Sequence, residues 1–569
     1  MNTTEQTLQA ARATRLDQIL TRSAQRSPRE VALRFEERTH SYEALEAAVT
    51  NVAAALLDAG ISGGERVAAY GLNSDAYGVL FLACARAGLV HVPVNFALKG
   101  GELRYLLEDS GAALLAVDPA LRPSVQAVLD DGGAPSVRAV WELLPGDTAG
   151  TGAANGGSDA GSTAANANAA ATGERATEGA NPASGTGSAA PSVLELAFPG
   201  EGGPRPSEEA RQRLEGLSVG GEDLAQLLYT SGTTSAPKGA MMTHAALMAE
   251  YVSATIALDL SAEDRPLIAM PLYHSAAMHV FLMPYLALGA TIRLLPKPDV
   301  GRILELVEAE RITSLFLAPT VWVPLANHPE LESRDLSSLE KAQYGASIMP
   351  TTVLARLQAR YPRIGFYNCF GQSELGPLCT VLRPEEHEVR PASAGRPVYF
   401  VQARVMTADG VEAAVGEPGE VQYRGPQLFS GYWGKPEQTA DALDGGWFRS
   451  GDQVTRDAGG YLQVVDRIKD VINTGGVLVA PREVEDVIYE IEGVAEVAVI
   501  GLPDERWIEA VTAIVVLKDG AQLTPEGVIA HVKERIAGFK VPKTVEFVAE
   551  LPRNQSGKLL KRELRAQRS

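Results

Sequence analysis

The sequence predicts an α/β protein of two units, a large N-terminal one and a small C-terminal one. A chain of 569 residues is too long for one hydrophobic core, which favours at least two domains. Helical and strand patterns alternate from about residue 17 to 118, and the alternation returns from Leu224 to about Gln463. A shorter run of strands and helices then reaches the C-terminus. We therefore assign the large domain to residues 1–465 and the small domain to residues 466–569.

The individual elements follow from local hydrophobic patterns. In the large domain the clearest patterns are helices at 42–59 and 75–87 and strands at 66–70 and 114–117. In the small domain they are helices at 481–489 and 525–536 and strands at 494–499, 510–516 and 545–547. The apolar segment Met278 to Ala290 is too short to span a membrane and contains Pro284, so it predicts a helix of the core.

Residues 146–203 interrupt the pattern of the large domain. Apart from the short apolar run 193–198, they are mostly Ala, Gly, Ser, Thr and Asn without a hydrophobic period. Such a composition buries too little apolar area to offset the entropy that ordering would cost. We therefore expect a disordered surface insertion between two elements of one domain.

The composition excludes several classes of protein. Hydrophobic residues make up 45% and charged residues 21%, as in ordinary soluble globular proteins. The net charge of −19 argues against nucleic-acid binding, which needs a basic face. The three cysteines lack metal-ligand spacing and are too few for a disulfide framework, which favours a reducing cytoplasm. No apolar run approaches the ~20 residues of a transmembrane segment, and residues 1–30 do not resemble a signal peptide.

The stretch LYTSGTTSAPKGAMMTH, residues 228–244, places Ser, Thr, Gly and Lys in one short loop. The loop lies between the apolar run 224–229 and an expected helix. Backbone amides freed by glycine, together with hydroxyls and one ammonium group, form a cradle for phosphate. Lys238 precedes Gly239 here, whereas the lysine of a Walker loop follows the second glycine. The loop therefore predicts a nucleotide-phosphate site of another lineage.

Six further motifs follow this loop along the chain. They are PLYH (271–274), YGAS (344–347), YNCFGQSELGP (367–377), GWFRSGDQ (446–453), YLQVVDRIKDVINTGGVLVAPREVE (461–485) and LPRNQSGKLLKRELR (551–565). Together with the loop they resemble the motifs of the adenylate-forming superfamily, which includes acyl-CoA synthetases, peptide-synthetase adenylation domains and beetle luciferases. The chain looks most like the fatty-acyl-CoA ligases. The resemblance implies a large domain of mixed sheets flanked by helices and a small, mobile α+β lid domain with its hinge near Lys469.

The resemblance also implies which residues meet the phosphates. Thr230 would lie near the metal and the phosphates, Lys238 would neutralise phosphate charge, and Glu374 would bind Mg²⁺. One or two carboxylates with phosphate oxygens and water are the usual surroundings of Mg²⁺. His274 would border both the acyl pocket and the phosphates. The other loop residues implied in phosphate binding are Ser231, Gly232, Thr233 and Thr234.

A second implied group surrounds the nucleoside. Phe370 would stack on adenine, and Ser373 would place a hydroxyl near the phosphates. Asp452 would accept hydrogen bonds from the ribose hydroxyls, with Arg467 as a second ribose contact. The positions whose backbone is implied to lie against the nucleotide are Gly345, Ala346 and Gly371.

The small domain contributes the remaining implied residues. Lys558 matches the lysine that reaches the carboxylate and the α-phosphate. Lys469 matches the residue about which the domain turns. Gly475 and Gly476 match a backbone strip that lines the pantetheine tunnel after the turn, and glycine suits such close approach.

The implied function is an ATP-dependent acyl-CoA synthetase that uses Mg²⁺ and coenzyme A and activates a hydrophobic acid, foremost a medium- or long-chain fatty acid. The apolar stretch 275–289 suits such an acyl chain. An aromatic-acid CoA ligase and an acyl-AMP ligase that loads a carrier protein remain alternatives, whereas nothing favours a luciferase-like oxygenase or a non-catalytic binding protein. Two positions depart from the family pattern. Ser235 replaces the usual loop glycine, which we expect to stiffen the loop. Val477-Leu478 replaces a commoner Glu-Asn, which puts the thiol tunnel or its rim in doubt. The thiol acceptor and the oligomeric state, monomer or homodimer, stay open at this point.

Overall fold

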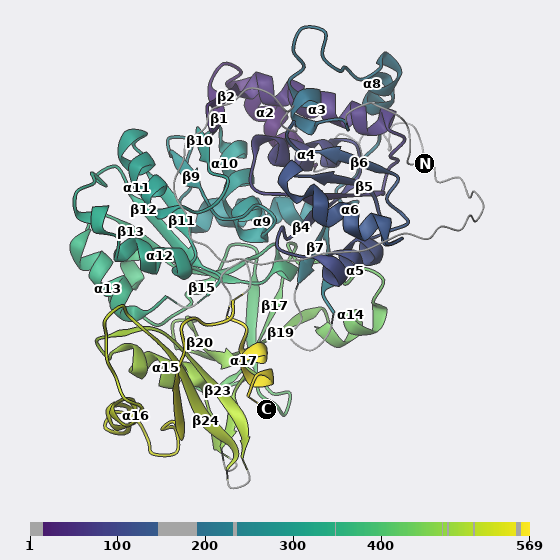
Figure 1. The fold of residues 1–569 in the computed structure, drawn as a ribbon. Helices are drawn as coiled ribbons and strands as arrows, with labels where there is room; N and C mark the ends of the chain where they lie inside the picture. Colours follow the sequence, from purple (N-terminus) through teal and green to yellow (C-terminus); the bar gives the residue numbers. More distant parts are fainter. Residues whose placement is uncertain are drawn as a thin grey trace, which may run out of the picture.

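The computed structural model describes residues 15–145, 190–230, 236–347, 349–468, 470–474, 477–504, 507–553 and 559–568, and every structural statement below concerns these residues. A large body holds two β-sheets and most helices, and a smaller C-terminal body lies below it in Figure 1. This arrangement confirms the predicted α/β class with a large N-terminal and a small C-terminal domain.

The first sheet of the large domain has nine strands and is mostly parallel. Its antiparallel pairs are β1–β2 at one edge and β13–β14 and β14–β15 at the other. In spatial order the strands are β15 (Arg396–Pro397), β14 (Leu378–Leu382), β13 (Gly365–Gly371), β12 (Lys341–Gly345), β11 (Ser314–Leu317), β9 (Pro266–Ile268), β10 (Ile292–Leu294), β1 (Val31–Phe35) and β2 (Arg38–Ser41).

The second sheet has six strands, all parallel except β8. In spatial order they are β6 (Ala139–Glu142), β5 (Ala112–Val117), β3 (Arg66–Tyr70), β4 (Val90–Val94), β7 (Leu224–Thr230) and β8 (Lys238–Thr243). In the middle of this sheet β3 runs beside β4 from Arg66 opposite Val90 to Tyr70 opposite Val94.

Two helices lie between these sheets. Helix α4 (Asp75–Arg86) contacts β4 of one sheet and β1 of the other, and α9 (His244–Ala257) contacts β8 and β14. Every residue of α4 is buried, because its sequence is apolar on all sides and both sheets cover it. Ser74 caps its start by accepting a hydrogen bond from the backbone N–H of Tyr77. The shared core therefore joins the two sheets into one domain.

The large domain holds further helices, several of which are labelled in Figure 1. They are α2 (Gln18–Arg26), α3 (Tyr42–Asp58), α5 (Gly100–Ser110), α6 (Arg122–Asp130), α7 (Val193–Ala197), α8 (Glu208–Glu215), the π-helical turn Ala276–Leu282 with α10 (Met283–Leu288), α11 (Val300–Ala309), α12 (Pro319–Ala326), α13 (Thr351–Arg360) and α14 (Pro436–Ala442).

A five-stranded antiparallel sheet leads from the large body to the small one. It consists of β16 (Gln402–Met406), β17 (Gly419–Arg424), β18 (Leu443–Asp444), β19 (Trp447–Arg456) and β20 (Leu462–Arg467). The small domain follows with β21 (Ile472–Thr474), β22 (Val477–Val479), α15 (Pro481–Tyr489), β23 (Val494–Asp504), β24 (Ile508–Leu517), α16 (Pro525–Lys533), β25 (Thr544–Phe547) and α17 (Lys561–Ala566). It has a hydrophobic core of its own, mainly valine side chains.

Most elements lie where the sequence predicts them. The predicted strand 66–70 and helix 481–489 match β3 and α15 residue for residue, and the segment 278–290 forms core helix as expected. Most of the predicted insertion 146–203 falls outside the described residues. Its C-terminal end differs from the expectation, because residues 193–197 form α7 and bury Val193 and Leu196 in the core. No described helix has the length and apolar character needed to cross a bilayer.

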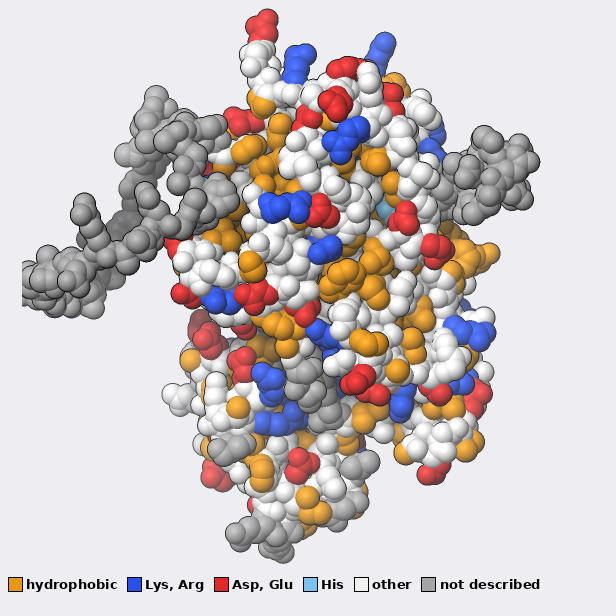
Figure 2. Space-filling model, turned by 90° about the vertical axis from the view of Figure 1, so that its right-hand side faces the viewer, with side chains coloured by type: hydrophobic (Ala, Val, Ile, Leu, Met, Phe, Trp, Pro, Cys, Tyr) orange, Lys and Arg blue, Asp and Glu red, His pale blue; other side chains and the backbone are white. Residues whose placement is uncertain are grey.

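The surface charge is mixed on the face shown in Figure 2. Lysine and arginine side chains lie there among aspartate and glutamate side chains and small apolar areas. This face therefore offers no continuous basic surface to a nucleic acid, in keeping with the net charge of −19.

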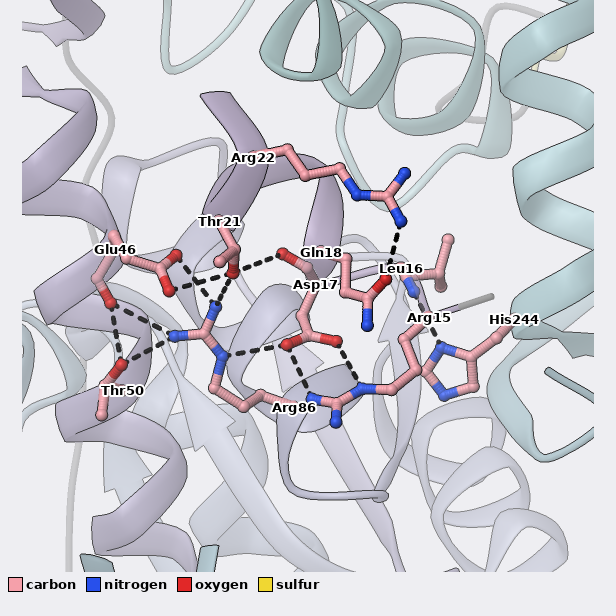
Figure 3. Close-up of polar contacts among 10 residues, drawn as sticks. All are labelled: Arg15, Leu16, Asp17, Gln18, Thr21, Arg22, Glu46, Thr50, Arg86 and His244. Atoms are coloured by element: carbon pink, nitrogen blue, oxygen red, sulfur yellow. Dashed lines mark hydrogen bonds and ion pairs between the residues drawn. The ribbon is translucent and has the colours of Figure 1, made fainter. Parts of the chain in front are cut away.

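A buried polar network ties the start of the chain to this core (Figure 3). Asp17 is 2% exposed and accepts hydrogen bonds from Arg15 (2.8 Å) and from Nε of Arg86 (3.0 Å). Arg86, on α4, also donates to Glu46 on α3 at 2.9 Å. The Leu16 N–H donates to Nδ1 of His244, and burial lowers the pKa of His244 to about 4, so the ring stays neutral and accepts. Segments from α2, α3, α4 and α9 thus share one network.

We expect Arg86→Ala to lower the free energy of unfolding by on the order of 3 kcal/mol, because it removes a charged partner of the buried Asp17 carboxylate and the hydrogen bonds that Arg86 donates to Thr50 and Glu46. Arg22→Ala is the matched control, since Arg22 is exposed and contacts only Gln18 in this network, and it should cost less than about 0.5 kcal/mol. Urea unfolding of both variants checks this. Equal losses would mean that the network adds nothing to stability.

Candidate active site

The loop predicted to bind phosphate joins two antiparallel strands. Thr230 at the end of β7 lies directly opposite Lys238 at the start of β8, so the mouth of the loop carries a hydroxyl and an ammonium group. Residues 238–243, expected as part of the loop, pair with β7 as a strand, and the helix expected after the stretch 228–244 is α9, which begins at His244. The predicted anion site is therefore the connection of a β-hairpin.

Glu374 lies beside this hairpin. A short 3₁₀-helix, Ser373–Leu375, follows β13 and places the carboxylate where it is 7% exposed. Its Oε1 atom accepts a hydrogen bond from the hydroxyl of Thr230 (3.3 Å) and another from the hydroxyl of Tyr432 (2.9 Å). Within the described part of the chain, no donor contacts Oε2. One carboxylate oxygen is thus held in place while the other keeps its lone pairs.

Tyr432 also contacts the lysine of the loop. The ammonium group of Lys238 lies 4.8 Å from the centroid of the Tyr432 ring, a cation–π distance. Burial, together with the charge of Glu374, raises the pKa of Tyr432, so its phenol keeps the proton that it donates. Thr230 and Lys238 of the loop and Glu374 of the motif 367–377 therefore meet in one cluster.

The backbone expected against the nucleotide lies at the carboxyl ends of two adjacent parallel strands, β12 and β13. Gly345 and Gly371 both need to be glycine, because a Cβ atom there would collide with the carbonyl oxygens of neighbouring strand residues. Ala346 has a φ of 65°, a conformation that non-glycine residues rarely adopt and that often marks functional sites. Phe370 is half-buried beside them. The carboxyl ends of parallel strands are the usual ligand edge of such sheets.

The segment of His274 reaches the same region. Its neighbour Ser275 places its Oγ 3.1 Å from the Oγ of Ser373, the residue before Glu374. The Nδ1 atom of His274 accepts a hydrogen bond from the Ala276 N–H, which orients the ring at the start of the π-helical turn. A π-helical turn inside a helix is frequent at functional sites. The predicted pocket wall therefore adjoins the Ser373–Glu374 segment.

The expected ribose contacts are cross-strand partners. Asp452 on β19 pairs in register with Arg467 on β20, and their side chains form an ion pair of 2.6 Å. Asp452 is 3% exposed and also accepts a hydrogen bond from the Gln372 amide at 2.5 Å. Gln372 lies two residues before Glu374. This hydrogen bond therefore links Asp452 of the five-stranded sheet to the segment that is predicted to bind the metal, which follows β13 of the nine-stranded sheet.

The remaining predicted site residues lie outside the described part of the chain, so their roles stay predictions. They are Ser231, Gly232, Thr233, Thr234, Lys469, Gly475, Gly476 and Lys558. The described neighbours of Lys469 are well anchored. Asp470 pairs with Arg565 of α17 at 2.8 Å, and the Asp466 carboxylate accepts a hydrogen bond from the Arg482 N–H of α15.

The donor atoms of this cluster suit a hard cation bound together with phosphate. Among the described residues, no group of three or more His, Cys, Asp or Glu side chains could enclose a metal ion by itself. A single carboxylate with a free oxygen and a nearby hydroxyl matches the way Mg²⁺ is held beside a nucleotide, where phosphates and water complete the shell. Glu374 and Thr230 therefore fit the predicted metal.

Two protein-family models match the sequence of this chain. A model of the AMP-binding enzyme family matches residues 20–433, and a model of the C-terminal domain of AMP-binding enzymes matches residues 483–558. The chain belongs to the AMP-binding enzyme family. It is an acid–thiol ligase, as the sequence predicts, and enzymes of this family use ATP and coenzyme A.

Relatives of this AMP-binding enzyme match almost end to end. A feruloyl-CoA synthase of an Amycolatopsis species is 36% identical over 96% of this chain and 97% of its own length. An indoleacetate–CoA ligase of Aromatoleum aromaticum is 32% identical over 97% of both chains, and a long-chain-fatty-acid–CoA ligase of Mycobacterium tuberculosis is 31% identical over 93% of both. The crystal structure of ATP-bound MatB from Rhodopseudomonas palustris superposes with a TM-score of 0.80 at 28% identity, covering 98% of this chain and 99% of that one.

Sequence reasoning gave no individual role to three residues that contact predicted site residues, namely Tyr432, Gln372 and Ser275. Tyr432 lies between Gly431 and Trp433 and outside every recognised motif. Gln372 and Ser275 each lie next to a predicted residue within or beside a recognised motif, so the motif itself carried the signal. Tyr432 had no such signal, because its contact with Glu374 joins segments 58 positions apart.

A second buried carboxyl group holds the segment that follows Glu374. Glu250 on α9 is fully buried and accepts hydrogen bonds from the Leu378 N–H (3.1 Å) and the Gln427 amide (2.7 Å). Burial raises the pKa of the Glu250 carboxyl well above its usual range. The Gln427 amide also donates to the carbonyl of Leu375, which closes the clamp around the end of the 3₁₀-helix.

We expect Glu250→Ala to lower the free energy of unfolding by on the order of 3 kcal/mol, because it leaves the Leu378 N–H unpaired and opens a cavity between the sheets. Glu263→Ala removes the same side chain from an exposed position and should stay within about 0.5 kcal/mol of the parent. Urea titration followed by tryptophan fluorescence measures both. Similar values for the two variants would contradict the clamp.

Proposed function

We propose that this protein is an AMP-forming acyl-CoA synthetase that activates a hydrophobic carboxylic acid, with an aromatic acid as the first candidate. The observation that carries the proposal is the cluster in which the Thr230 hydroxyl, the Lys238 ammonium group and the Glu374 carboxylate converge beside the ligand edge of β12 and β13. These groups come from separate segments and together match the needs of a magnesium nucleotide.

The first half-reaction joins two anions. The acid carboxylate would attack the α-phosphorus of ATP, forming an acyl-adenylate and releasing pyrophosphate. Lys238 would cancel phosphate charge at the mouth of the hairpin, and Thr230 and Glu374 would hold Mg²⁺, which supplies charge neutralisation at the phosphates when bound. Phe370 would stack on adenine, and the Asp452–Arg467 pair would position the ribose. Positioning and electrostatics thus do most of the catalytic work.

The second half-reaction would use the small domain differently. A thiol displaces AMP from the acyl-adenylate, and coenzyme A is the proposed donor of that thiol. We propose that rotation near Lys469 withdraws Lys558 and brings Gly475 and Gly476 to the active site to line the pantetheine tunnel. The domain limits 1–465 and 466–569 belong to this proposal. Strand β20 ends at Arg467 and β21 begins at Ile472, so the change from one sheet to the next lies a few residues after that limit. We place the enzyme in the cytoplasm, where its three free, buried cysteines stay reduced.

The substrate class rests on the relatives. Two end-to-end relatives named for aromatic acids, feruloyl and indoleacetate, are 36% and 32% identical. The first expectation, a medium- or long-chain fatty acid, has the support of the fatty-acid–CoA ligase at 31% identity and stays the second candidate. Loading of a carrier protein is the third.

Product analysis tests the proposal directly. We expect mass spectrometry of enzyme with Mg-ATP, coenzyme A and a mixed panel of aryl and fatty acids to show one class of acyl-CoA, with aryl acids preferred. Reactions without coenzyme A are the control and should stop at acyl-AMP. Preference for fatty acids would select the second candidate, and acyl-AMP that accumulates despite coenzyme A would select carrier loading. Absence of any adenylate would overturn the function.

Lys558→Ala separates the two half-reactions. We expect the variant to lose acid-dependent pyrophosphate exchange, because the proposed contact with the carboxylate and α-phosphate is removed. Thioester formation from chemically prepared acyl-AMP and coenzyme A should remain within about threefold of the parent, since Lys558 would have left the site. Lys540→Ala, which removes a lysine paired with Glu483 elsewhere in the small domain, is the control. Parallel losses in both half-reactions would argue against the rotation.

A further inference from the structure

Tyr432 is the one residue that contacts both charged groups of the phosphate cluster within the described part of the chain. Its hydroxyl donates to Oε1 of Glu374 at 2.9 Å, and its ring lies 4.8 Å below the ammonium group of Lys238. Within the described part of the chain, the carboxylate and the lysine do not contact each other directly. The tyrosine therefore connects the group expected to hold the metal with the group expected to hold the phosphates.

The backbone around Tyr432 is fixed on both sides of the site. Residues 430–433 run along β8 as an added strand, with the Met241 N–H bonded to the carbonyl of Gly431 and the Trp433 N–H to that of Gly239. The Phe429 N–H donates to the carbonyl of Glu374 at 2.8 Å. The loop thus joins the phosphate hairpin to the 3₁₀-helix of Glu374 through the main chain as well as through the tyrosine side chain.

The side chain itself is held rigidly. Tyr432 is 7% exposed and packs edge-on against Phe429 at 4.8 Å between ring centroids. Gly431 has a φ of 120°, and a Cβ atom there would lie 2.7 Å from Thr439, so this turn requires glycine. The Tyr432 N–H donates to the Thr439 hydroxyl at 2.9 Å. The ring therefore has little freedom to leave either charged group.

We propose that Tyr432 is a positioning residue of the ATP site, with two separable actions. Its hydroxyl fixes Oε1 of Glu374 so that Oε2 faces the metal, and its ring restrains the flexible Lys238 side chain on the same side before the nucleotide arrives. Restraint before binding reduces the entropy lost when the ligand is bound. This inference rests on the ATP site of the proposed function and names no new ligand.

Two substitutions at one position separate the actions. Tyr432→Phe removes only the hydroxyl and leaves the ring beneath Lys238, whereas Tyr432→Leu removes both. Tyr367→Phe is the matched control, because Tyr367 also donates its hydroxyl to a carboxylate, that of Asp259 at 3.0 Å, away from the cluster. All three variants keep an apolar side chain at a buried position.

The readout is equilibrium binding of ATP by calorimetry without acid or coenzyme A, once with excess Mg²⁺ and once with EDTA. We expect Tyr432→Phe to weaken binding on the order of tenfold with Mg²⁺ and to leave binding in EDTA unchanged. Tyr432→Leu should weaken binding in both media, because Lys238 is released as well. Tyr367→Phe should match the parent in both.

Three results would overturn the inference. Parent-like binding by Tyr432→Phe with Mg²⁺ would show that the hydroxyl does not position the metal ligand. Equal loss with and without Mg²⁺ would indicate a merely structural role for the hydroxyl. Parent-like or tighter binding of metal-free ATP by Tyr432→Leu would show that the ring does not prepare Lys238. If the parent protein bound no ATP, the proposed function itself would fail, which is a different result from these three.

Discussion

The hydrogen bonds that meet at Oε1 of Glu374 are the contacts on which the rest of the site depends. One comes from Thr230 at the end of the six-stranded sheet, and the other from Tyr432 in the loop between β17 and α14. Glu374 itself follows β13 of the nine-stranded sheet. Three parts of the fold therefore define the position of a single carboxylate, and a hydrogen bond to a charged group is worth about 1.5–3 kcal/mol. The cation and the phosphates can be placed only as well as this carboxylate is.

The packing of the large domain makes that precision attainable. Helices α4 and α9 fill the space between the two sheets, so neither sheet can shift without disturbing a shared core. Buried polar groups within that core fix the positions of its elements relative to one another. Arg86 on α4 and Glu250 on α9 each hold chain segments that are distant in sequence, and the second of them clamps the turn just after Glu374. The large domain thus combines apolar packing between its sheets with buried polar contacts that hold distant segments against that core.

The sequence predicted the fold and much of the site because its signals are local. The strand 66–70 and the helix 481–489 have clear periodicity and boundaries, and Thr230, Lys238, Glu374, Asp452 and Arg467 all lie in recognisable motifs that the fold brings together. The strand β8 lies inside the stretch 228–244 that was expected as one loop, because a short run such as 238–243 has no decisive period and only its pairing with β7 makes it a strand. Tyr432 and Glu250 escaped prediction for a related reason, since their importance comes from partners 58 and 128 positions away. Helix α7 was hidden by its flank, whose composition gave no sign that Val193 and Leu196 reach the core.

The contacts on either side of residue 469 bear on how the proposed rotation could occur. Few described hydrogen bonds cross from β20 to the small domain. The Arg482 N–H of α15 bonds to Asp466, and the N–H groups of Asp470 and Val471 bond to the carbonyl of Arg467. Lys561 of α17 is half-buried near the Asp466 carboxylate, and its ammonium group pairs with Glu485. At about 1 kcal/mol for each hydrogen bond, a turn that broke these contacts would cost only a few kcal/mol. The differential binding of acyl-adenylate and coenzyme A can supply that amount, so the linkage is strong enough to hold one orientation and weak enough for a substrate to replace it.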